Sequence, residues 1–397
     1  MASNGNSDSA VRVGAVREVR FVHTADWQLG MTRHFLDADA QPRYTAARID
    51  ALHRIAEVAR EHGAEFVVVC GDVLESNAVG PRVLSRTLEA LRAFSDVGVP
   101  VYLLPGNHDP LDASSLLASP AVRDTPGVHV LDTAGPLEVR PGVELVAAPW
   151  TSKHPTGDLL AQATEGLVAD GTLRIVVGHG AVDELSPDRD DPARIALAPL
   201  EEAIADGRIH YVALGDRHST TQVGRSGAVW YAGTQEVTDR LETDPGNVLV
   251  VEVGDASPPK VEPVRVGRWA FPHVRAELDS SNDVEALRRQ LEALPAKDRT
   301  VVTLSLTGTL TVGAKATLDD LLAVQGDLLA GVQHWERHSD LVVRADADEL
   351  ADLGIGGFAD AAVAELSALA QGDGPDAEAA RDALSLVFRL AGGGTRA

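Results

Sequence analysis

The chain lacks the residues and segments that would indicate a secreted or membrane-bound protein. Its one cysteine, Cys70, excludes an intramolecular disulfide framework. No run of apolar residues is long enough to span a bilayer, and the first residues, "MASNGNSDSAVRVG", lack the apolar core of a signal peptide. We therefore expect a cytoplasmic protein that does not enter the membrane.

Positive charge is also scarce. Lys and Arg number 35 against 59 Asp and Glu, which gives a formal net charge of -24. A molecule with this charge repels nucleic acid as a whole, so any binding to phosphates must depend on local arginine clusters or on bound metal ions. The composition therefore disfavours a DNA-binding protein without excluding one.

Strands and helices alternate from Val19 to about Val266. Short β-branched runs such as "EFVVVC" and "LRIVVGH" end in loops with Gly, Asp, Asn or His, and "RYTAARIDALHRIAEVAREHG" carries apolar residues at helical spacing. Early strands alternate with helices, whereas later strands follow one another directly. This pattern predicts an α/β sandwich whose second half is richer in strands.

The length indicates more than one domain. A chain of 397 residues, 44% of them hydrophobic, is too long for one ordinary core and sufficient for two or three. The acidic, proline-rich stretch "GDASPPKVEPV" marks the approach to a boundary near residue 270. The predicted parts are a disordered N-terminus (1–18), a main domain (19–268), a small α+β domain (269–350) and a helical tail (351–397).

Five predicted strands end in loops that are rich in metal-ligand residue types: "HTADWQ", "VVVCGDVLE", "LLPGNHDP", "VVGHGA" and "ALGDRHS". Such loops meet at the carboxyl ends of the strands, where α/β folds place their sites. Taken alone, Asp26 and Gln28 are typical of a turn or a helix cap, but four partner loops favour a site. Their carboxylates, amides and imidazoles can hold two divalent ions that share a carboxylate.

The order and spacing of these motifs carry a family resemblance. "GD" after an apolar strand, then "GNHD", "GH" and a Gly-x-x-His turn resemble the calcineurin-like metallophosphoesterase superfamily. Within it, "HTADWQLG" and "YLLPGNHDP" look most like the SbcD-type nuclease subunits of double-strand-break processing complexes. The motifs cover roughly residues 19–235, and the rest resembles that family only in layout. The resemblance implies a four-layer αββα metallophosphoesterase sandwich with a small C-terminal α+β cap domain and a helical tail.

The resemblance also implies the metal ligands by position. They are Asp26, Asp72 and His218 for the first ion, and Asn107, His179 and Asp216 for the second. Asp72 would bridge the two ions, and Gln28 would sit beside the first. The implied cofactors are two divalent ions, with Mn²⁺ first and Mg²⁺ or Fe²⁺ as alternatives. For His218 a purely structural role stays open.

His108 and Asp109 are the implied catalytic residues. In such enzymes a metal-activated hydroxide attacks phosphorus in line. His108 would face the substrate, where its imidazole stabilises the transition-state charge or protonates the leaving oxygen. Asp109 would orient His108.

Two positions depart from the family pattern. Gln28 stands where the family usually has histidine, and Asp216 stands where the last motif usually begins Gly-His. An amide oxygen is a poorer donor than imidazole, whereas a carboxylate strengthens the binding of hard cations. We hypothesise that the two changes compensate and shift the preference toward Mn²⁺ or Mg²⁺.

Residues beside the motifs are candidates for binding substrate. Four basic side chains flank the motifs and can contact phosphates or remain solvated loop residues: Arg33, His34, Arg217 and Arg225. Trp27 can stack on a base, although filling space beneath the site is the preferred interpretation.

The implied partners are DNA, an SbcC-like coiled-coil ATPase and a second copy of the chain in a homodimer. The chain contains no coiled coil and no phosphate-binding Gly-Lys-Ser/Thr loop, so the ATPase must be a separate protein. The helical tail would either dock on it or pack on its own small domain. Two other functions stay open, namely a small-molecule or nucleotide phosphodiesterase or phosphatase and a catalytically weakened scaffold.

Overall fold

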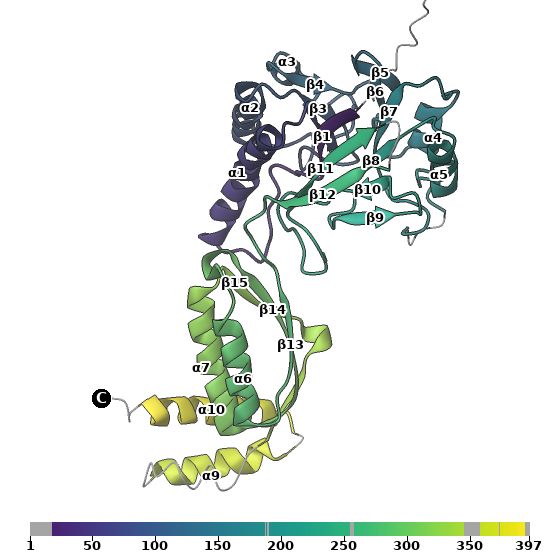
Figure 1. Ribbon diagram of the computed structural model, residues 1–397. Helices are drawn as coiled ribbons and strands as arrows, with labels where there is room; N and C mark the ends of the chain where they lie inside the picture. Colours follow the sequence, from purple (N-terminus) through teal and green to yellow (C-terminus); the bar gives the residue numbers. More distant parts are fainter. Residues whose placement is uncertain are drawn as a thin grey trace, which may run out of the picture. The chain divides into compact units, whose positions relative to one another are not determined.

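The computed structural model describes residues 18–186, 188, 190–254, 258–344, 358–372 and 374–393 (Figure 1). The predicted disordered N-terminus lies outside the described residues except for Glu18, as does the first part of the predicted tail. In the described ranges, no helix has both the length and the apolar character needed to cross a membrane.

The described chain divides into two compact units. Unit 1 comprises Met1–Met31, Ala47–Glu236 and Glu242–Gly267, and unit 2 comprises Thr32–Ala46, Val237–Leu241 and Arg268–Ala397.

The first sheet of unit 1 has the strand order β12-β11-β1-β2-β3-β4. Its strands are β1 (Glu18–Thr24), β2 (Phe66–Cys70), β3 (Val101–Leu104), β4 (Val128–Val130), β11 (Asn247–Gly254) and β12 (Lys260–Arg265). Strands β1 to β4 are parallel, and β11 joins β1 antiparallel with Val19 opposite Val253. Every residue of β2 is buried, as expected for a parallel strand that is covered on both faces.

The second sheet of unit 1 has the order β5-β6-β7-β8-β10-β9. Its strands are β5 (Gly135–Arg140), β6 (Val143–Ala147), β7 (Leu173–His179), β8 (Tyr211–Gly215), β9 (Thr221–Val223) and β10 (Val229–Tyr231). Strands β6, β7 and β8 are parallel, so their carboxyl ends lie at one edge of the sheet.

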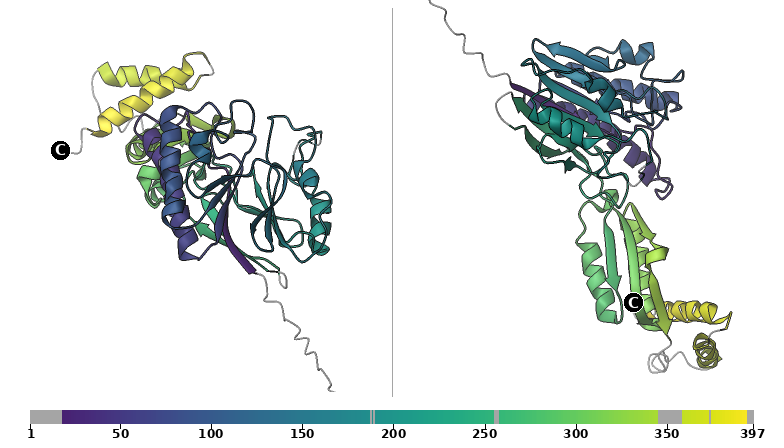
Figure 2. Two further views of the ribbon diagram at one scale, coloured as in Figure 1. Left: turned by 90° about the horizontal axis from the view of Figure 1, so that it is seen from above. Right: turned by 90° about the vertical axis from the view of Figure 1, so that its right-hand side faces the viewer.

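Helices cover the outer faces of the two sheets (Figures 1 and 2). They are α1 (Ala40–Glu61), α2 (Pro81–Asp96) and α3 (Pro120–Arg123) on the first sheet, and α4 (Leu159–Thr164) and α5 (Leu197–Ala205) on the second. Helix α2 begins with Pro81 at its first position, which suits a residue without an amide donor, and it buries Leu91 and Phe94.

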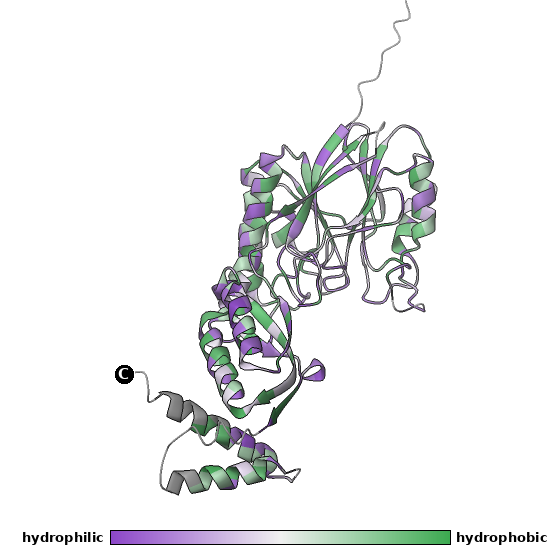
Figure 3. Ribbon diagram, turned by 60° about the horizontal axis from the view of Figure 1, so that its bottom comes forward, coloured by the Kyte–Doolittle hydropathy of each residue, from purple (hydrophilic) through white to green (hydrophobic). Residues whose placement is uncertain are grey.

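Three apolar layers result from this stacking. One lies between α1, α2 and the first sheet, one lies between the sheets and includes Phe21, Val68 and Ile175, and one lies between the second sheet, α4 and α5. Figure 3 shows apolar residues along the strands of both units. The predicted four-layer αββα sandwich is confirmed, and the prediction that its second half is richer in strands is confirmed with it.

In its described residues, unit 2 contains a parallel sheet and four long helices. Its elements are β13 (His273–Glu277), α6 (Ser281–Glu292), η1 (Lys297–Arg299), β14 (Val301–Thr311), α7 (Val312–Leu328), β15 (Gly331–His334), η2 (Glu336–His338), β16 (Asp340–Arg344), α9 (Phe358–Ala370) and α10 (Ala377–Gly393). The order is β13-β14-β15, and β16 also pairs with β14. Leu287 of α6 and Leu318 of α7 share an apolar cluster with Leu304 and Leu306 of β14, and this cluster is the core of unit 2.

Two segments that the sequence analysis places in the main domain cluster with unit 2. These are 32–46 and 237–241. Tyr44 packs edge-on against Trp269 with ring centroids 5.3 Å apart, and its hydroxyl donates to the Val237 carbonyl at 2.7 Å. Aromatic contacts of this kind involve residues far apart in the sequence, so no local pattern indicates them.

The described part of the tail packs within unit 2. Val363 of α9 and Ala380 and Leu384 of α10 share an apolar cluster with Val312 of α7. The structure therefore brings the tail onto its own small domain, which is one of the two arrangements that the sequence analysis leaves open.

Candidate metal centre

The five motif loops follow the carboxyl ends of five strands in the two sheets of unit 1. Strands β1, β2 and β3 lead into the first three loops, β7 ends at His179, and β8 leads into the last. Asp26, Asp72 and His179 each offer one ligand atom, and these three atoms lie within 4.8 Å of one another. All three side chains are buried. Residues separated by more than 150 positions thus form one polar cluster inside an apolar sandwich.

His179 is held in one orientation. Its Nδ1 lies 2.8 Å from the Cys70 carbonyl and therefore donates to it. Its Nε2 faces the Oδ1 atoms of Asn107 at 2.9 Å, Asp72 at 3.5 Å and Asp216 at 3.8 Å. A histidine ligand commonly uses one ring nitrogen for the metal and donates with the other to a carbonyl or carboxylate. His179 therefore presents Nε2 to three oxygen donors, which are the partners that the sequence analysis expects around the second ion.

Asp26 and His218 interact electrostatically. The charge of His218 acts to lower the pKa of Asp26, and the charge of Asp26 acts to raise the pKa of His218. The backbone amide of Asp216 donates to both carboxylate oxygens of Asp26, at 3.0 and 3.1 Å. His218 Nδ1 lies 2.9 Å from Oε1 of Glu242, whose side chain is 7% exposed. In this contact, as in that of His179 with Cys70, Nδ1 of the ring is held by an oxygen acceptor, an arrangement that is common for histidines beside metal ions.

Gln28 is buried against the site with an unpaired oxygen. Its backbone amide donates to the Asp72 carbonyl at 2.7 Å, and the residue is 3% exposed. Its side-chain Oε1 is buried and has no hydrogen-bond partner among the described residues. A buried amide oxygen without a partner costs about 1–3 kcal/mol, so the geometry suits an additional donor or cation at this oxygen.

The backbone of the site is strained. Four candidate ligands have left-handed backbone angles, namely Asp26 (φ 54), Gln28 (φ 40), Asp72 (φ 54) and Asp216 (φ 96), and in the described residues Ala296 is the one other non-glycine with positive φ. Such conformations cost about 1–3 kcal/mol each and concentrate at functional sites.

Two glycines allow the loops to approach. A Cβ at Gly71 would meet the ring of His179, and a Cβ at Gly106 would meet the carboxylate and the amide of Asp72. Gly71 also has a φ of 86, which favours glycine. The glycines of "GD" and "GNHD" are thus required by close packing around the ligands.

Negative charge exceeds positive charge in the cluster. Burial raises the pKa of Asp26 to about 6, and it also raises the pKa of Asp216. Burial also raises the pKa of Asp109 to about 7, and the nearby Asp72 carboxylate adds to this. Burial acts to lower the pKa of His179, but the surrounding carboxylates outweigh it and raise that pKa to about 9. Crowded carboxylates, imidazoles and an unpaired amide oxygen fit divalent cations.

His108 lies at the exposed side of the cluster. Its side chain is 38% exposed, its Nε2 is 3.9 Å from Oδ2 of Asp72, and its backbone amide donates to Oδ1 of Asp72 at 2.9 Å. Its Nδ1 lies 2.9 Å from the Glu75 carbonyl. The expected orientation of His108 by Asp109 is therefore replaced by a bond to Glu75.

Asp109 holds the loop rather than the ring of His108. It is fully buried, and its two carboxylate oxygens accept from the backbone amides of Gly106 at 2.8 Å and Leu74 at 2.9 Å. These bonds tie the "GNHD" turn to the loop that follows Asp72.

The predicted substrate-binding residues are not part of the cluster. Arg217 is exposed and donates to Thr221, and Arg225 is exposed in the turn between β9 and β10. Arg33 and His34 belong to unit 2. A role for these four residues in binding phosphates stays a prediction.

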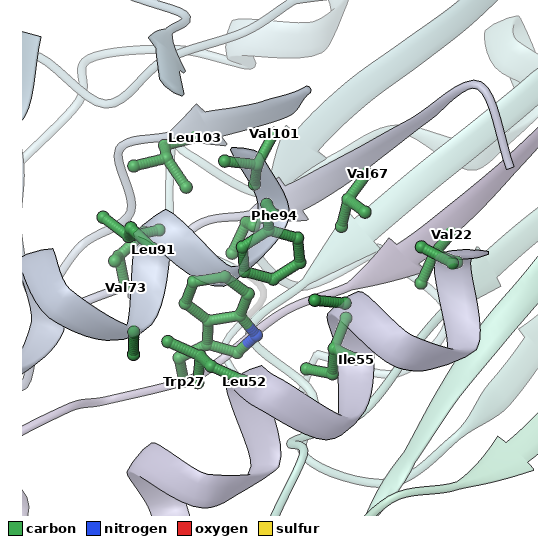
Figure 4. Packing of buried hydrophobic residues seen from close by; sticks show 14 of the residues in the cluster. Val22, Trp27, Leu52, Ile55, Val67, Val73, Leu91, Phe94, Val101 and Leu103 are labelled. Carbon is green, nitrogen blue, oxygen red and sulfur yellow. The ribbon is translucent and has the colours of Figure 1, made fainter. Parts of the chain in front are cut away.

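Trp27 fills space beneath the site. It is fully buried, stacks on Phe94 with ring centroids 6.1 Å apart, and donates from Nε1 to Thr24 at 2.9 Å. Figure 4 shows its indole among Leu52, Ile55 and other apolar side chains. The preferred interpretation of Trp27 is confirmed.

Two residues that contact the site were not predicted from the sequence. Glu242 lies in the stretch "RLETDPG", which carries no motif. Arg48 lies one helical turn before Leu52 on the apolar side of α1, and a charged residue at that spacing was a usable signal. Both are buried or nearly so, and both act on residues that the motifs did identify.

Several known proteins are similar to this chain. Residues 19–251 match the model of the calcineurin-like phosphoesterase family. The chain is 24% identical over 288 residues to the DNA double-strand break repair protein Mre11 of Thermoplasma acidophilum, which covers 70% of this chain and 73% of that protein. It is 32% identical over 116 residues to the SbcD component of nuclease SbcCD from Bacillus subtilis, which covers 28% and 27%. A solved dimetal phosphatase from Danio rerio is similar over 61% of this chain and 98% of its own, with 13% identity and a TM-score of 0.38.

Proposed function

Because the chain belongs to the calcineurin-like phosphoesterase family and is a metal-dependent phosphoester hydrolase, we propose that it is a two-metal nuclease that cuts DNA as an exonuclease or endonuclease. The observation that carries the proposal is the buried group of Asp26, Asp72 and His179, whose ligand atoms lie within 4.8 Å of one another. The choice of DNA as substrate is supported by the similarity to proteins named for DNA double-strand break repair and for nuclease activity.

We assign the ligands as two sets that share Asp72. Asp26, Asp72 and His218 hold the first ion with Gln28 beside it, and Asp72, Asn107, His179 and Asp216 hold the second. When bound, two divalent ions provide Lewis acidity, activate water and neutralise charge on a phosphoryl group. The side chains around them orient the ligand nitrogens, through the bonds of His179 to Cys70 and of His218 to Glu242.

His108 is proposed to act on the substrate. Its Nδ1 is occupied by the Glu75 carbonyl, so Nε2 is the nitrogen that exchanges a proton with solvent or substrate. The proposal is supported by the 38% exposure of the His108 side chain and by the 3.9 Å distance between its Nε2 and Oδ2 of Asp72. In its protonated form, Nε2–H can donate to the leaving oxygen or stabilise the transition-state charge.

Gln28 and Asp216 are proposed to act as a compensating pair that favours Mn²⁺ or Mg²⁺. The buried, unpaired Oε1 of Gln28 supports a weak ligand at the first ion, and the carboxylate of Asp216 near His179 supports a hard ligand at the second. We would measure the Mn²⁺ content of Gln28→His, Asp216→His and the double variant by elemental analysis. Coupled positions give a non-additive effect, and independent effects would contradict the pairing.

We also propose the arrangement of domains and partners. The nuclease domain spans 19–268, the cap domain 269–350 and the helical tail 351–397, and the enzyme works as a homodimer with an SbcC-like ATPase as a separate chain. The tail contributes to ATPase docking through surfaces of α9 and α10 that the contact with α7 leaves open, such as Leu369 and Leu386, which are 45% and 48% exposed. Co-purification of full-length and tail-deleted protein with a candidate ATPase tests this, and equal recovery of both would contradict it.

The net charge of -24 favours a second candidate, a phosphodiesterase or phosphatase for small molecules or nucleotides, because an acidic surface repels long nucleic acids. One assay separates the two functions. Purified protein with Mn²⁺ is offered linear and single-stranded DNA, bis-p-nitrophenyl phosphate and cyclic nucleotides, with His108→Ala as the control. DNA cleavage that is lost in the variant supports the nuclease, and cleavage of small esters alone supports the second candidate. No turnover of any substrate contradicts both.

A further inference from the structure

A buried arginine lies directly behind the metal-ligand turn. Arg48 of α1 is 1% exposed. Its Nη2 donates to the Trp27 carbonyl at 2.6 Å and to the Asp26 carbonyl at 3.3 Å, and its Nη1 donates to the Glu236 carbonyl at 3.0 Å. One guanidinium therefore joins two segments that are about 200 positions apart in the sequence.

Two neighbouring side chains bind the same carbonyls. The hydroxyl of Thr234 lies 2.9 Å from the Asp26 carbonyl and shares its one hydrogen between this acceptor and the Glu236 carbonyl at 3.0 Å and Gln235 Oε1 at 3.1 Å. Nε2 of Gln235 donates to the Trp27 carbonyl at 3.0 Å. Both residues are fully buried. We call Arg48, Thr234 and Gln235 the carbonyl clamp.

The clamp acts on the strained part of the site. Asp26 and Gln28 hold left-handed backbone angles, which persist only where the surroundings fix them. On the amide side of the turn, the Asp26 and Gln28 amides donate to the carbonyls of Gly71 and Asp72 at 3.1 and 2.7 Å. On the carbonyl side, the contacts come from the clamp. Without the clamp, the two carbonyls would be buried without these donors and the turn would be free to relax toward ordinary backbone angles.

Arginine suits this position because its planar fork carries donors on two nitrogens. It can therefore bind carbonyls of both segments at once, whereas lysine has a single ammonium group on a flexible stem.

We propose that Arg48 is a positioning residue that, with Thr234 and Gln235, fixes the Asp26–Gln28 turn in the metal-binding conformation. The inference rests on the proposed function of the cluster as a divalent metal centre. Arg48 touches neither the ion nor the substrate and acts through the backbone carbonyls of Asp26 and Trp27.

The test measures Mn²⁺ affinity by isothermal titration calorimetry in full-length protein. For Arg48→Met we expect the affinity to fall about 10- to 100-fold, which is the usual effect of removing a residue that supports metal ligands. For Arg48→Lys, which keeps the charge and loses the fork, we expect a smaller loss. Thr234→Val removes one donor to the Asp26 carbonyl at nearly constant volume, and we expect a loss of several-fold, so the test still works if Arg48→Met does not fold.

Arg174 provides a matched control. It is 5% exposed in unit 1, and it pairs with Glu144 and Asp170, each at 2.8 Å. It lies five residues before His179 on β7, which is about 16 Å along a strand. Arg174→Met should lower the melting temperature as Arg48→Met does, but it should leave Mn²⁺ affinity unchanged.

The outcomes separate the clamp from the proposed function. Reduced Mn²⁺ affinity in Arg48→Met or Thr234→Val, with unchanged affinity in Arg174→Met, supports the clamp. Wild-type affinity in both clamp variants, or an equal loss in the Arg174 control, overturns the inference and leaves the metal centre in place. Failure of the wild-type protein to bind Mn²⁺ overturns the metal centre and the clamp together.

Discussion

Replacing Asp26 by asparagine removes a buried charge while keeping the shape of the side chain and one oxygen for the Asp216 amide. Burial raises the pKa of Asp26 from 3.8 to about 6, a difference of about two units. Folding therefore favours the protonated acid. In the metal-free protein, the stability associated with Asp26 is present below pH 3.8 and is lost as the pH rises through 6, and two units correspond to about 3 kcal/mol.

The variant should consequently be more stable than the wild type when metal is removed at neutral or alkaline pH. In EDTA at pH 8 we expect Asp26→Asn to raise the free energy of unfolding by at most about 3 kcal/mol, and at pH 4 we expect a difference of less than about 1 kcal/mol. With Mn²⁺ at about 100 times its Kd, the wild type should gain about 2.7 kcal/mol and the variant much less, so Mn²⁺ should remove most of the difference in stability between the two proteins.

The assay is urea unfolding at pH 4 and pH 8, in EDTA and in Mn²⁺, followed by tryptophan fluorescence. The exposed Asp96 of α2, changed to asparagine, controls for the loss of one carboxylate at the surface. If metal-free Asp26→Asn is no more stable than the wild type at pH 8, the claim that the ionised Asp26 is held at a cost for metal binding is wrong.

Three further substitutions test separate parts of the site. His108→Ala should lower kcat about 10²- to 10⁴-fold and leave Mn²⁺ affinity unchanged in titration, and a variant with normal kcat would remove His108 from the mechanism. Glu242→Gln should weaken Mn²⁺ binding about 10- to 100-fold in equilibrium dialysis, because the ring of His218 loses its charged partner, and unchanged binding would contradict that role. Gly106→Ala should lower both the melting temperature and the Mn²⁺ content, since the new Cβ meets the Asp72 carboxylate, and a fully loaded, stable variant would show that the turn can adjust.

The sequence predicted the sandwich and the convergence of its loops because both follow from local signals. Alternating strands and helices are visible as hydrophobic periods, and the candidate ligands lie at or just after the ends of the apolar runs that form β1, β2, β3, β7 and β8. Parallel order brings together the carboxyl ends of β1, β2 and β3 in the first sheet and of β7 and β8 in the second, and the stacking of the two sheets then brings Asp26, Asp72 and His179 together.

The supporting residues were not predictable in the same way. Arg48 and Glu242 reach the site through contacts that depend on side-chain direction in the folded chain, and neither lies in a motif loop. The expected partnership of Asp109 with His108 differed because the turn brings the Glu75 carbonyl to Nδ1 and directs Asp109 to backbone amides. Adjacency in the sequence indicated a contact that the backbone geometry of the turn does not make.

The division of the chain into two units also depends on long-range contacts that local sequence patterns do not indicate. Segments 32–46 and 237–241 follow the motif loops in sequence, yet they cluster with unit 2 through contacts such as Tyr44 with Trp269. A boundary read from a proline-rich stretch describes one continuous chain segment. It cannot represent a unit assembled from three separate ones.

The number of Mn²⁺ ions bound per chain, measured by equilibrium dialysis with elemental analysis, tests the central claim most directly. The account predicts two ions per chain in the wild type and a loss of both from Asp72→Asn, because Asp72 contributes to both ligand sets and its Oδ1 lies 3.5 Å from Nε2 of His179. Only trace metal in the wild type, or the same two ions in the Asp72→Asn variant, would contradict it.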